Sequence, residues 1–402
     1  MGAGHGHGHL DEQVAPVRAR PWPAALLLGF LAVVGVAAVV AMVVMWPGRP
    51  DIDAKYIADG ARLVNAEVTS VKDSCAGQQT QDGAPECAEL RVRLLEGSEK
   101  GTPATVQVPP QVAESGLAKG DEVQVLQTPG TPPSYSFQSV NRNVPLGVLA
   151  AIFVIVVALV ARLRGLLAIV GLAFGAFVLV RFMIPALLEG SSGLLVALVG
   201  STAIMFVVLY LAHGPSLRTS AALAGTLVGV ALTGGIGLVM IREARLSGVA
   251  DEGAAFLTTF VPDLDFRGLL LCAVIVAGLG VLNDVTITQA SAVWELRGVA
   301  PHLTRRELFS RGMRIGRDHI ASTIYTIVFA YAGATLAVLL LVYIYRQPAD
   351  DLLSLEQFAE EVARTLASAI GLVLAVPITT AIAVLTVGEP VDEVPAVRGK
   401  HV

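Results

Sequence analysis

Two short stretches of this 402-residue sequence set carboxylates among hydroxyl and basic side chains in otherwise apolar surroundings. In the first, Asp284 is followed at intervals of four, three and four residues by Thr288, Ser291 and Glu295. A helix would place these side chains on one stripe. An ionised group near the centre of a membrane helix costs roughly 3 kcal/mol, so it usually faces a cavity or a partner. We expect a substrate- or ion-binding site here; the alternative is a carboxylate at the membrane boundary, beside Arg317.

The second stretch is Gly316-Arg317-Asp318-His319, followed by Ser322, Thr323 and Tyr325. Asp318, Ser322 and Tyr325 would share one face of a helix. We expect Arg317, Asp318 and Ser322 to belong to the same binding site as the first stretch. The alternative for Asp318 is a charge in the first turn of a helix, where the helix dipole favours an acidic residue.

The composition assigns both stretches to a membrane protein. Hydrophobic residues make up 54% of the chain and charged residues only 15%, a balance that soluble proteins do not show. The apolar residues form blocks of roughly twenty, the helix length that crosses about 30 Å of hydrocarbon. We therefore predict an all-α polytopic membrane protein with about eight transmembrane helices, at residues 24–46, 144–161, 166–188, 193–211, 221–241, 268–285, 320–345 and 366–387.

The arginines predict the orientation, because short loops that stay in the cytoplasm are enriched in Lys and Arg. Arg162 and Arg164, Arg218, and six arginines from Arg297 to Arg317 all fall in loops on one side of the predicted membrane. Both termini would then be cytoplasmic and the protein would lie in the plasma membrane. The expected domains are a disordered cytoplasmic tail (1–23), the first transmembrane helix (24–46), an extracytoplasmic domain (47–143), a seven-helix membrane domain (144–388) and a cytoplasmic tail (389–402).

The segment between the first two predicted helices changes from apolar blocks to alternation. Runs of strand type occur at residues 63–71, 90–95, 104–108 and 122–126, separated by Gly, Pro and polar turns. This pattern predicts a small β-rich barrel or sandwich of the OB kind. Its two cysteines, Cys75 and Cys87, would face the oxidising side of the membrane, so we predict a disulfide.

Other signals bear on metals, catalysis and partners. His5, His7 and His9 alternate with glycines and are candidate ligands for a divalent metal, although the same residues also read as a flexible tail. The sequence lacks a phosphate loop, a nucleophile elbow and a zinc helix, so we expect no enzyme and no cofactor. A formal charge of −5 without a basic surface argues against nucleic acid. The expected partners are membrane lipid, a small solute or ion, an extracytoplasmic protein and a second copy of the chain.

The two polar stretches resemble the YibE/F family of bacterial membrane proteins. Its members carry a glycine-containing apolar helix that runs into Asp-Val, here Asp284-Val285, and a Gly-Arg-Asp that opens the next long helix, here beginning at Gly316. This sequence departs from the usual small or apolar residues at Thr286, Thr288 and Gln289, and His319 follows Asp318. The resemblance implies a predicted permease or other multi-span protein.

Two functions follow from these observations. The first is a secondary transporter that moves a small solute or ion through the polar site. The second is a membrane assembly or envelope factor that does not transport and whose outer domain binds a partner. In either case we expect the glycines of the fifth block to serve tight helix packing: Gly225, Gly229, Gly234, Gly235 and Gly237.

Overall fold

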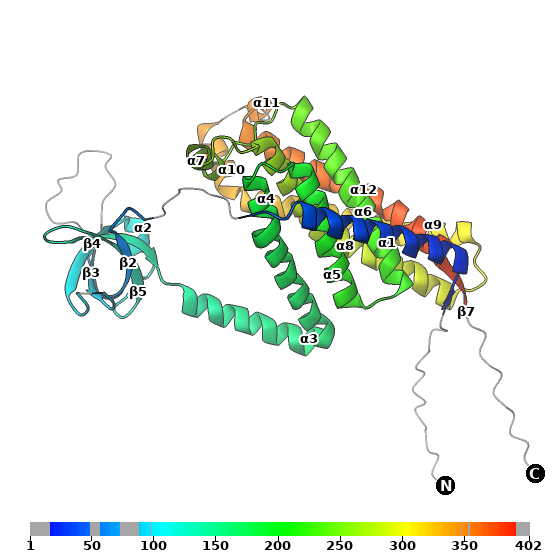
Figure 1. Ribbon diagram of the computed structural model, residues 1–402, viewed down its shortest axis with the longest axis horizontal. Coiled ribbons are helices and arrows are strands. Elements are labelled where there is room, and N and C mark those ends of the chain that lie inside the picture. Colours follow the sequence, from blue (N-terminus) through cyan, green and yellow to red (C-terminus); the bar gives the residue numbers. More distant parts are fainter. Residues whose placement is uncertain are drawn as a thin grey trace, which may run out of the picture. The chain divides into compact units, whose positions relative to one another are not determined.

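The computed structural model describes residues 17–48, 57–72, 88–97, 99–346, 348–352 and 354–390. The chain divides into two compact units, Asp53–Val160 and the remainder, Met1–Ile52 with Ala161–Val402 (Figure 1). The predicted disulfide between Cys75 and Cys87 and the candidate metal ligands His5, His7 and His9 lie outside the described residues.

The smaller unit contains the predicted β-rich domain. Its five strands form one antiparallel sheet in the order β4-β3-β2-β5-β6, and the edge strands β4 and β6 approach each other, so the sheet curves into a half-barrel. A short helix, α2 (Pro110–Ala113), connects β4 to β5. The strands are β2 (Arg62–Lys72), β3 (Ala88–Leu94), β4 (Pro103–Val108), β5 (Glu122–Thr128) and β6 (Ser134–Val140).

Alternate residues of these strands point into the half-barrel, as the two-residue repeat of a strand requires. Val68 of β2, Val92 of β3 and Val125 of β5 are fully buried. At one edge, Tyr135 donates a hydrogen bond of 2.5 Å to the Glu99 carboxylate. Burial and this carboxylate raise the pKa of the Tyr135 phenol above its ordinary value.

The larger unit is a helical bundle. Its main elements are α1 (Pro21–Val44), α5 (Gly193–His213), α6 (Leu217–Glu243), α8 (Phe266–Val299), α9 (Arg305–Ala334), α10 (Leu336–Tyr345) and α12 (Glu356–Thr386). The shorter helices are α4 (Ile184–Leu188), α7 (Glu252–Phe260) and α11 (Ala349–Leu352). In the described residues, six helical stretches are long and apolar enough to cross a membrane, and α9 with α10, bent by 67°, forms a broken seventh candidate.

One of the six candidates is a 46-residue stretch, Asn143–Leu188, which comprises α3 (Asn143–Val178), a π-helical turn (Leu179–Met183) and α4. A straight helix of this length would measure about 69 Å, roughly twice the thickness of a bilayer core. The backbone is non-helical at Arg162 (φ 54°, ψ −142°). This break falls between the second and third predicted transmembrane segments.

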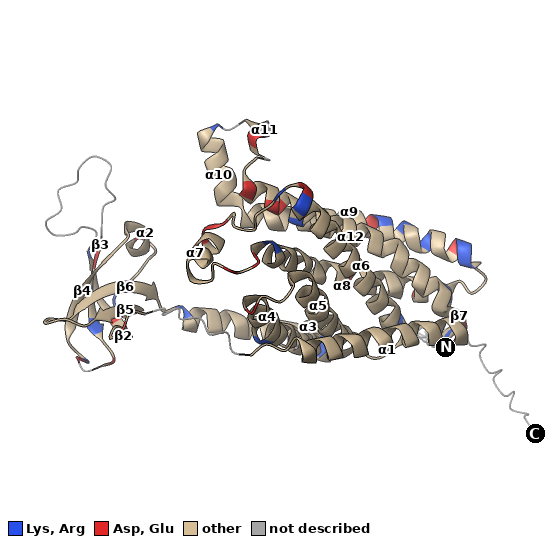
Figure 2. Ribbon diagram, turned by 45° about the horizontal axis from the view of Figure 1, so that its top comes forward, with Lys and Arg blue, Asp and Glu red and all other residues tan. Residues whose placement is uncertain are grey.

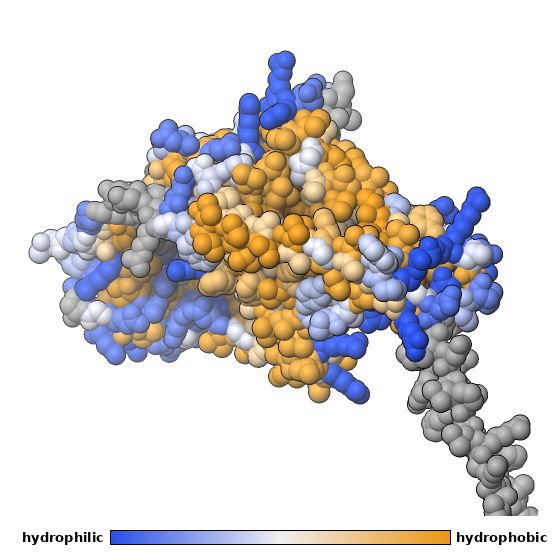
Figure 3. Space-filling model, turned by 45° about the vertical axis from the view of Figure 1, so that its right-hand side comes forward, coloured by the Kyte–Doolittle hydropathy of each residue, from blue (hydrophilic) through white to orange (hydrophobic). Residues whose placement is uncertain are grey.

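The centre of the bundle is formed by α6, α8 and α12, with α5, α9 and α1 packed around them. Glycines on α6 and α12 bring the backbones close together: Gly225 lies against Thr379, and Gly371 lies against Thr233. The outer surface of the bundle is apolar instead of polar, and Figure 3 shows apolar residues covering most of one face. Such a surface is typical of helices that contact lipid, as in a multi-pass membrane protein.

The first and last described elements meet at one end of the bundle. There β1 (Val17–Ala19) pairs antiparallel with β7 (Val387–Pro390), and the Arg20 amide donates to the Thr386 carbonyl oxygen at 3.0 Å. We call this end, where α1 begins and α12 ends, the N/C end. It serves below as the reference for depth along the helices.

The helices α8 and α9 extend beyond the sixth and seventh predicted apolar blocks. Instead of stopping at 285, α8 continues to Val299, and α9 begins at Arg305 instead of 320. A capping box starts α9: the Glu307 amide donates to the Thr304 hydroxyl, and the Thr304 amide donates to the Glu307 carboxylate. The alternative interpretation of Asp318 is therefore wrong, because this residue lies in the middle of a helix and not in its first turn. The expectation that the six arginines lie in a loop is also wrong, because all six lie on α8 or α9.

Candidate functional site

The candidate site lies where α8 and α9 run side by side. The Asp284 carboxylate of α8 lies 3.7 Å from Nε2 of His319 on α9, and the Thr288 hydroxyl lies 3.3 Å from the same nitrogen. The Thr288 hydroxyl also donates to the Asp284 carbonyl oxygen at 2.7 Å. An acid, an imidazole and a hydroxyl from two helices therefore converge on one point.

The side chains of this cluster lie on the surface of the described part of the chain. The Asp284 side chain is 67% exposed and that of His319 is 33% exposed. Thr288 is exposed as well, and Ser291, one turn further along α8, is half-buried. The polar stripe predicted for α8 is therefore present, and it faces away from the core of the helical bundle.

The other predicted site residues lie on α9 beside this cluster. Arg317, Asp318 and Ser322 are all exposed. The structure pairs Asp284 with His319, and among the described residues it shows no ion pair between Asp284 and Arg317. The residue that completes the cluster is therefore His319, which lies in the second polar stretch but was not among the expected site residues.

Behind the exposed cluster lies a buried polar seam between the central helices. Gln289, 3% exposed, donates from its amide nitrogen to the Gly312 carbonyl oxygen at 2.9 Å and to the Thr380 hydroxyl at 2.7 Å. The hydroxyls of Thr226 and Thr286 lie 2.6 Å apart. Gln289 already departs from the family pattern in the sequence. Its partners on α9 and α12 could not be predicted, because they lie 23 and 91 residues away along the chain.

These contacts measure the depth of the cluster. Thr380 precedes Thr386, at the N/C end of α12, by six residues, so the Gln289 contact lies about 9 Å from that end. The Thr226 contact with Thr286 lies about 14 Å from the start of α6. Because α8 runs parallel to α12 and antiparallel to α6, Asp284 lies five residues further from the N/C end than Gln289 and two further than Thr286, which is about 17 Å by either measure.

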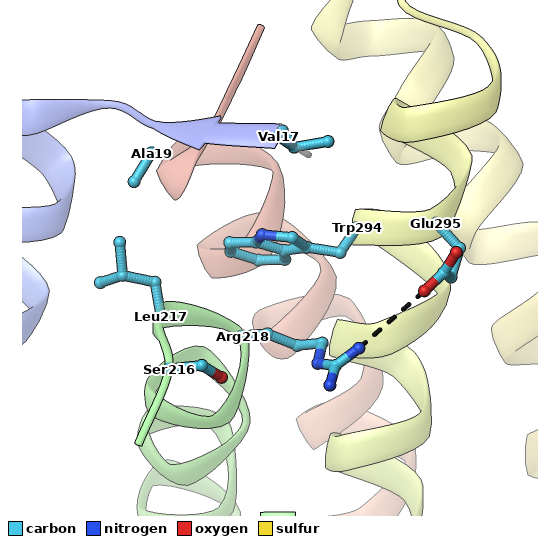
Figure 4. Close-up of a pocket in the computed structure, with 7 residues that line it drawn as sticks. All are labelled: Val17, Ala19, Ser216, Leu217, Arg218, Trp294 and Glu295. Carbon is cyan, nitrogen blue, oxygen red and sulfur yellow. Dashed lines mark ion pairs between the residues drawn. The ribbon is translucent and has the colours of Figure 1, made fainter. Parts of the chain in front are cut away.

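The same stripe of α8 ends in a pocket of about 410 Å³ at the N/C end (Figure 4). Here the Arg218 guanidinium of α6 lies 3.9 Å from the Glu295 carboxylate. Figure 4 shows the indole of Trp294 reaching from α8 into the space between β1 and the start of α6. Because Arg218 and Glu295 are 34% and 60% exposed, this pair is typical of a solvated boundary.

A metal site is not supported in the described part of the chain, where no three His, Cys, Asp or Glu residues are grouped to hold an ion. Asp284 and His319 alone provide two ligands. The chemistry that this arrangement offers is charge pairing and proton exchange between a carboxylate and an imidazole.

A model of the YibE/F-like protein family matches residues 149–389, more than half of the chain. The chain belongs to this family. The matched region includes α8, α9 and α12, and therefore the whole candidate site, whereas it leaves out the half-barrel. No curated protein and no solved structure matches the chain.

Proposed function

We propose that this YibE/F-like protein is a secondary transporter, not an enzyme, that moves a small solute or ion past the Asp284 and His319 pair. The observation that carries this proposal is the position of the pair about 17 Å along the helices from the N/C end. If the N/C end marks the edge of a bilayer core about 30 Å thick, the pair lies near the middle of that core. Ionisable residues at that depth usually mark an ion or proton pathway.

The pair suits a coupled cycle because both groups exchange protons. With Asp284 ionised and His319 protonated, the two attract each other across 3.7 Å, and loss of the imidazole proton leaves an unpaired carboxylate. That carboxylate can then take up a proton or a cation. Thr288 and Ser291, on the same stripe, and Arg317, Asp318 and Ser322, on the adjoining face of α9, would line the path.

The bend between α9 and α10 supplies a point at which the bundle can move. The two helices meet at 67° around Thr335, and α10 has no buried residue in the described chain. The bend lies about 24 Å beyond His319 along α9, so it is separate from the site and would act as a hinge for the segment that follows. We place the N/C end, and with it both termini, on the cytoplasmic side of the plasma membrane, as the arginine distribution predicts.

The test is flux into proteoliposomes under an imposed proton gradient, with a panel of small metal cations and anions. Asp284→Asn keeps the size of the side chain but removes the charge, and it is expected to abolish the flux. Glu295→Gln is the matched control, because Glu295 lies on the same stripe at the solvated N/C end and should be dispensable. Full flux in Asp284→Asn, with correct insertion, would refute the proposal.

A second candidate function is an assembly or envelope factor that acts through the half-barrel. The strand order and the approach of β4 to β6 are those of an OB-type barrel, a form often used for binding. A groove of about 520 Å³ at its base is bordered by Asp121, Glu122 and Arg142. Deletion of residues 57–142 decides between the two: flux that survives the deletion supports the transporter, whereas loss of cellular function in a correctly inserted protein whose full-length form shows no flux supports the factor.

A further inference from the structure

The outward face of α8 and α9 is charged at a depth where lipid would be expected. Asp284 contacts His319, and Arg317 and Asp318 precede His319 directly, so all four lie within about 6 Å of one another along the bundle axis. Figure 2 shows that the charged positions of α9 gather in its first half, towards the N/C end. We call these four residues the charged layer.

Lipid is a poor neighbour for this layer. A charge near the centre of the bilayer is strongly disfavoured, and long basic side chains escape to the interface only when they start near a helix end. The charged layer lies about 17 Å from the N/C end, and the Asp284 side chain is 67% exposed. The described chain therefore leaves its proposed binding site without one wall.

A second copy of the chain fits this face by charge. In a dimer whose two-fold axis lies along the membrane normal, residues at equal depth meet each other. The charged layer holds two acids, Asp284 and Asp318, and two basic groups, Arg317 and His319, at one depth. Each copy thus presents both signs at the level where the other does, so opposite charges can meet across the two-fold axis.

A similar level lies closer to the N/C end. Gly312 of α9 lies against Val293 and Gln289 of α8, so its neighbour Arg311 is nearly level with Glu295. Arg311 and Glu295 are both exposed. Glu295 also pairs with Arg218 of its own chain, so the match to a second copy rests on the charged layer, and this level adds only the exposed Arg311.

We propose that two copies of this chain dock through the outward faces of α8 and α9 and enclose the proposed binding site between them. This inference rests on the proposed site, because it adds the missing wall, but it concerns association and not flux. The contact would exclude lipid from the charged layer.

The test is crosslinking in native membranes with a short bismaleimide. Ala321 is exposed on α9, one turn beyond Arg317 and Asp318 on the same face, so Ala321→Cys is expected to give a strong dimer band. Ala37→Cys is the matched control: Ala37 is exposed at a similar depth on α1, about 24 Å from the N/C end, and should stay monomeric. The wild-type chain sets the background from its three native cysteines, of which Cys272 is buried.

A second variant protects the test against misfolding. Tyr325→Cys, one turn further along the same face of α9 and 63% exposed in the chain, should also crosslink. In the Ala321→Cys background, Arg317→Asp should weaken the band, and Arg317→Asp with Asp318→Arg should restore it, since both signs return to the layer. Bands no stronger than wild type at both cysteines, or an equal band at Ala37→Cys, would overturn the dimer. Loss of flux alone would bear only on the transport proposal.

Discussion

The contact between α6 and α12 at Gly225 gives the sharpest test of the packing. A Cβ at this position would overlap the Thr379 hydroxyl and lie 2.9 Å from the Thr379 Cβ and 3.3 Å from its Cα. The hydroxyl cannot simply turn away, because it donates a buried hydrogen bond of 2.8 Å to the Ala375 carbonyl oxygen. Overpacking of this kind costs about 1–3 kcal/mol, and the gain in helix propensity returns at most about 1 kcal/mol. Gly225→Ala should therefore destabilise the protein by about 1–2 kcal/mol.

Gly235 provides the control within the same helix. It is exposed, and no atom lies within 4 Å of a Cβ built there, so Gly235→Ala should be neutral or slightly stabilising. The assay is thermal unfolding of both purified variants in one detergent, followed by tryptophan fluorescence. A loss of 1 kcal/mol lowers the midpoint by roughly 2–4 °C in proteins of 150–250 residues. Equal midpoints for the two variants would show that the close contact of α6 with α12 is wrong.

Three further predictions concern single hydrogen bonds. Gln289→Leu removes the hydrogen bonds to Gly312 and Thr380. Each such bond between membrane helices is worth about 0.6 kcal/mol, so the midpoint of thermal unfolding should fall by a few degrees. An unchanged midpoint would contradict the buried seam. Glu360 is 7% exposed and accepts a hydrogen bond of 3.1 Å from the Gly248 amide. Glu360→Ala should lower the free energy of unfolding by about 1–3 kcal/mol, and Glu360→Gln, which keeps an acceptor, by distinctly less. Equal losses would show that Glu360 does not act as this hydrogen-bond acceptor. The absorbance of the tyrosines is titrated in the wild type and in Tyr135→Phe, and the difference between the two curves reports on Tyr135 alone. Its midpoint should lie above 10, the ordinary pKa of tyrosine, and Glu99→Gln should lower that pKa. Because this pKa is higher in the folded state, the associated stability is present below the unfolded pKa and is lost as pH rises through the folded one; a midpoint at or below 10 would refute the network.

The half-barrel was largely predictable because its strands alternate. The runs at 63–71, 104–108 and 122–126 fall within β2, β4 and β5, and the run at 90–95 overlaps β3. The sequence did not indicate β6, since Ser134, Ser136 and Gln138 alternate with only two aromatic residues on an edge strand. An edge strand buries little, so its pattern is weak.

The membrane helices were predictable in position but not in length. Hydropathy measures transfer into lipid, whereas a helix continues wherever its backbone is satisfied and one face is packed. The first half of α9 carries many charges, yet Leu308, Gly312 and Gly316 pack inwards on a single stripe. The pairing of Asp284 with His319 depends on the register of α8 against α9, which neither segment encodes alone.

The glycines of α6 illustrate the same limit. Gly225, Gly229, Gly234 and Gly237 all contact neighbouring helices, as expected, but Gly235 faces outwards without a neighbour within 4 Å. Spacing along a helix separates faces by about 100° per residue, so Gly234 and Gly235 cannot both serve one contact. Which of the two is buried is decided by the partner helix.

The pairing of β1 with β7 also constrains how the protein is made. The strand before α1 finds its partner only after α12 has left the ribosome, because β7 follows every helix of the bundle. During synthesis α1 must therefore wait beside α5 and α6 with its leading strand unpaired. A nascent chain stalled before Val387 would hold all the helices without this latch, and closure of the N/C end would report that translation of the whole bundle is finished.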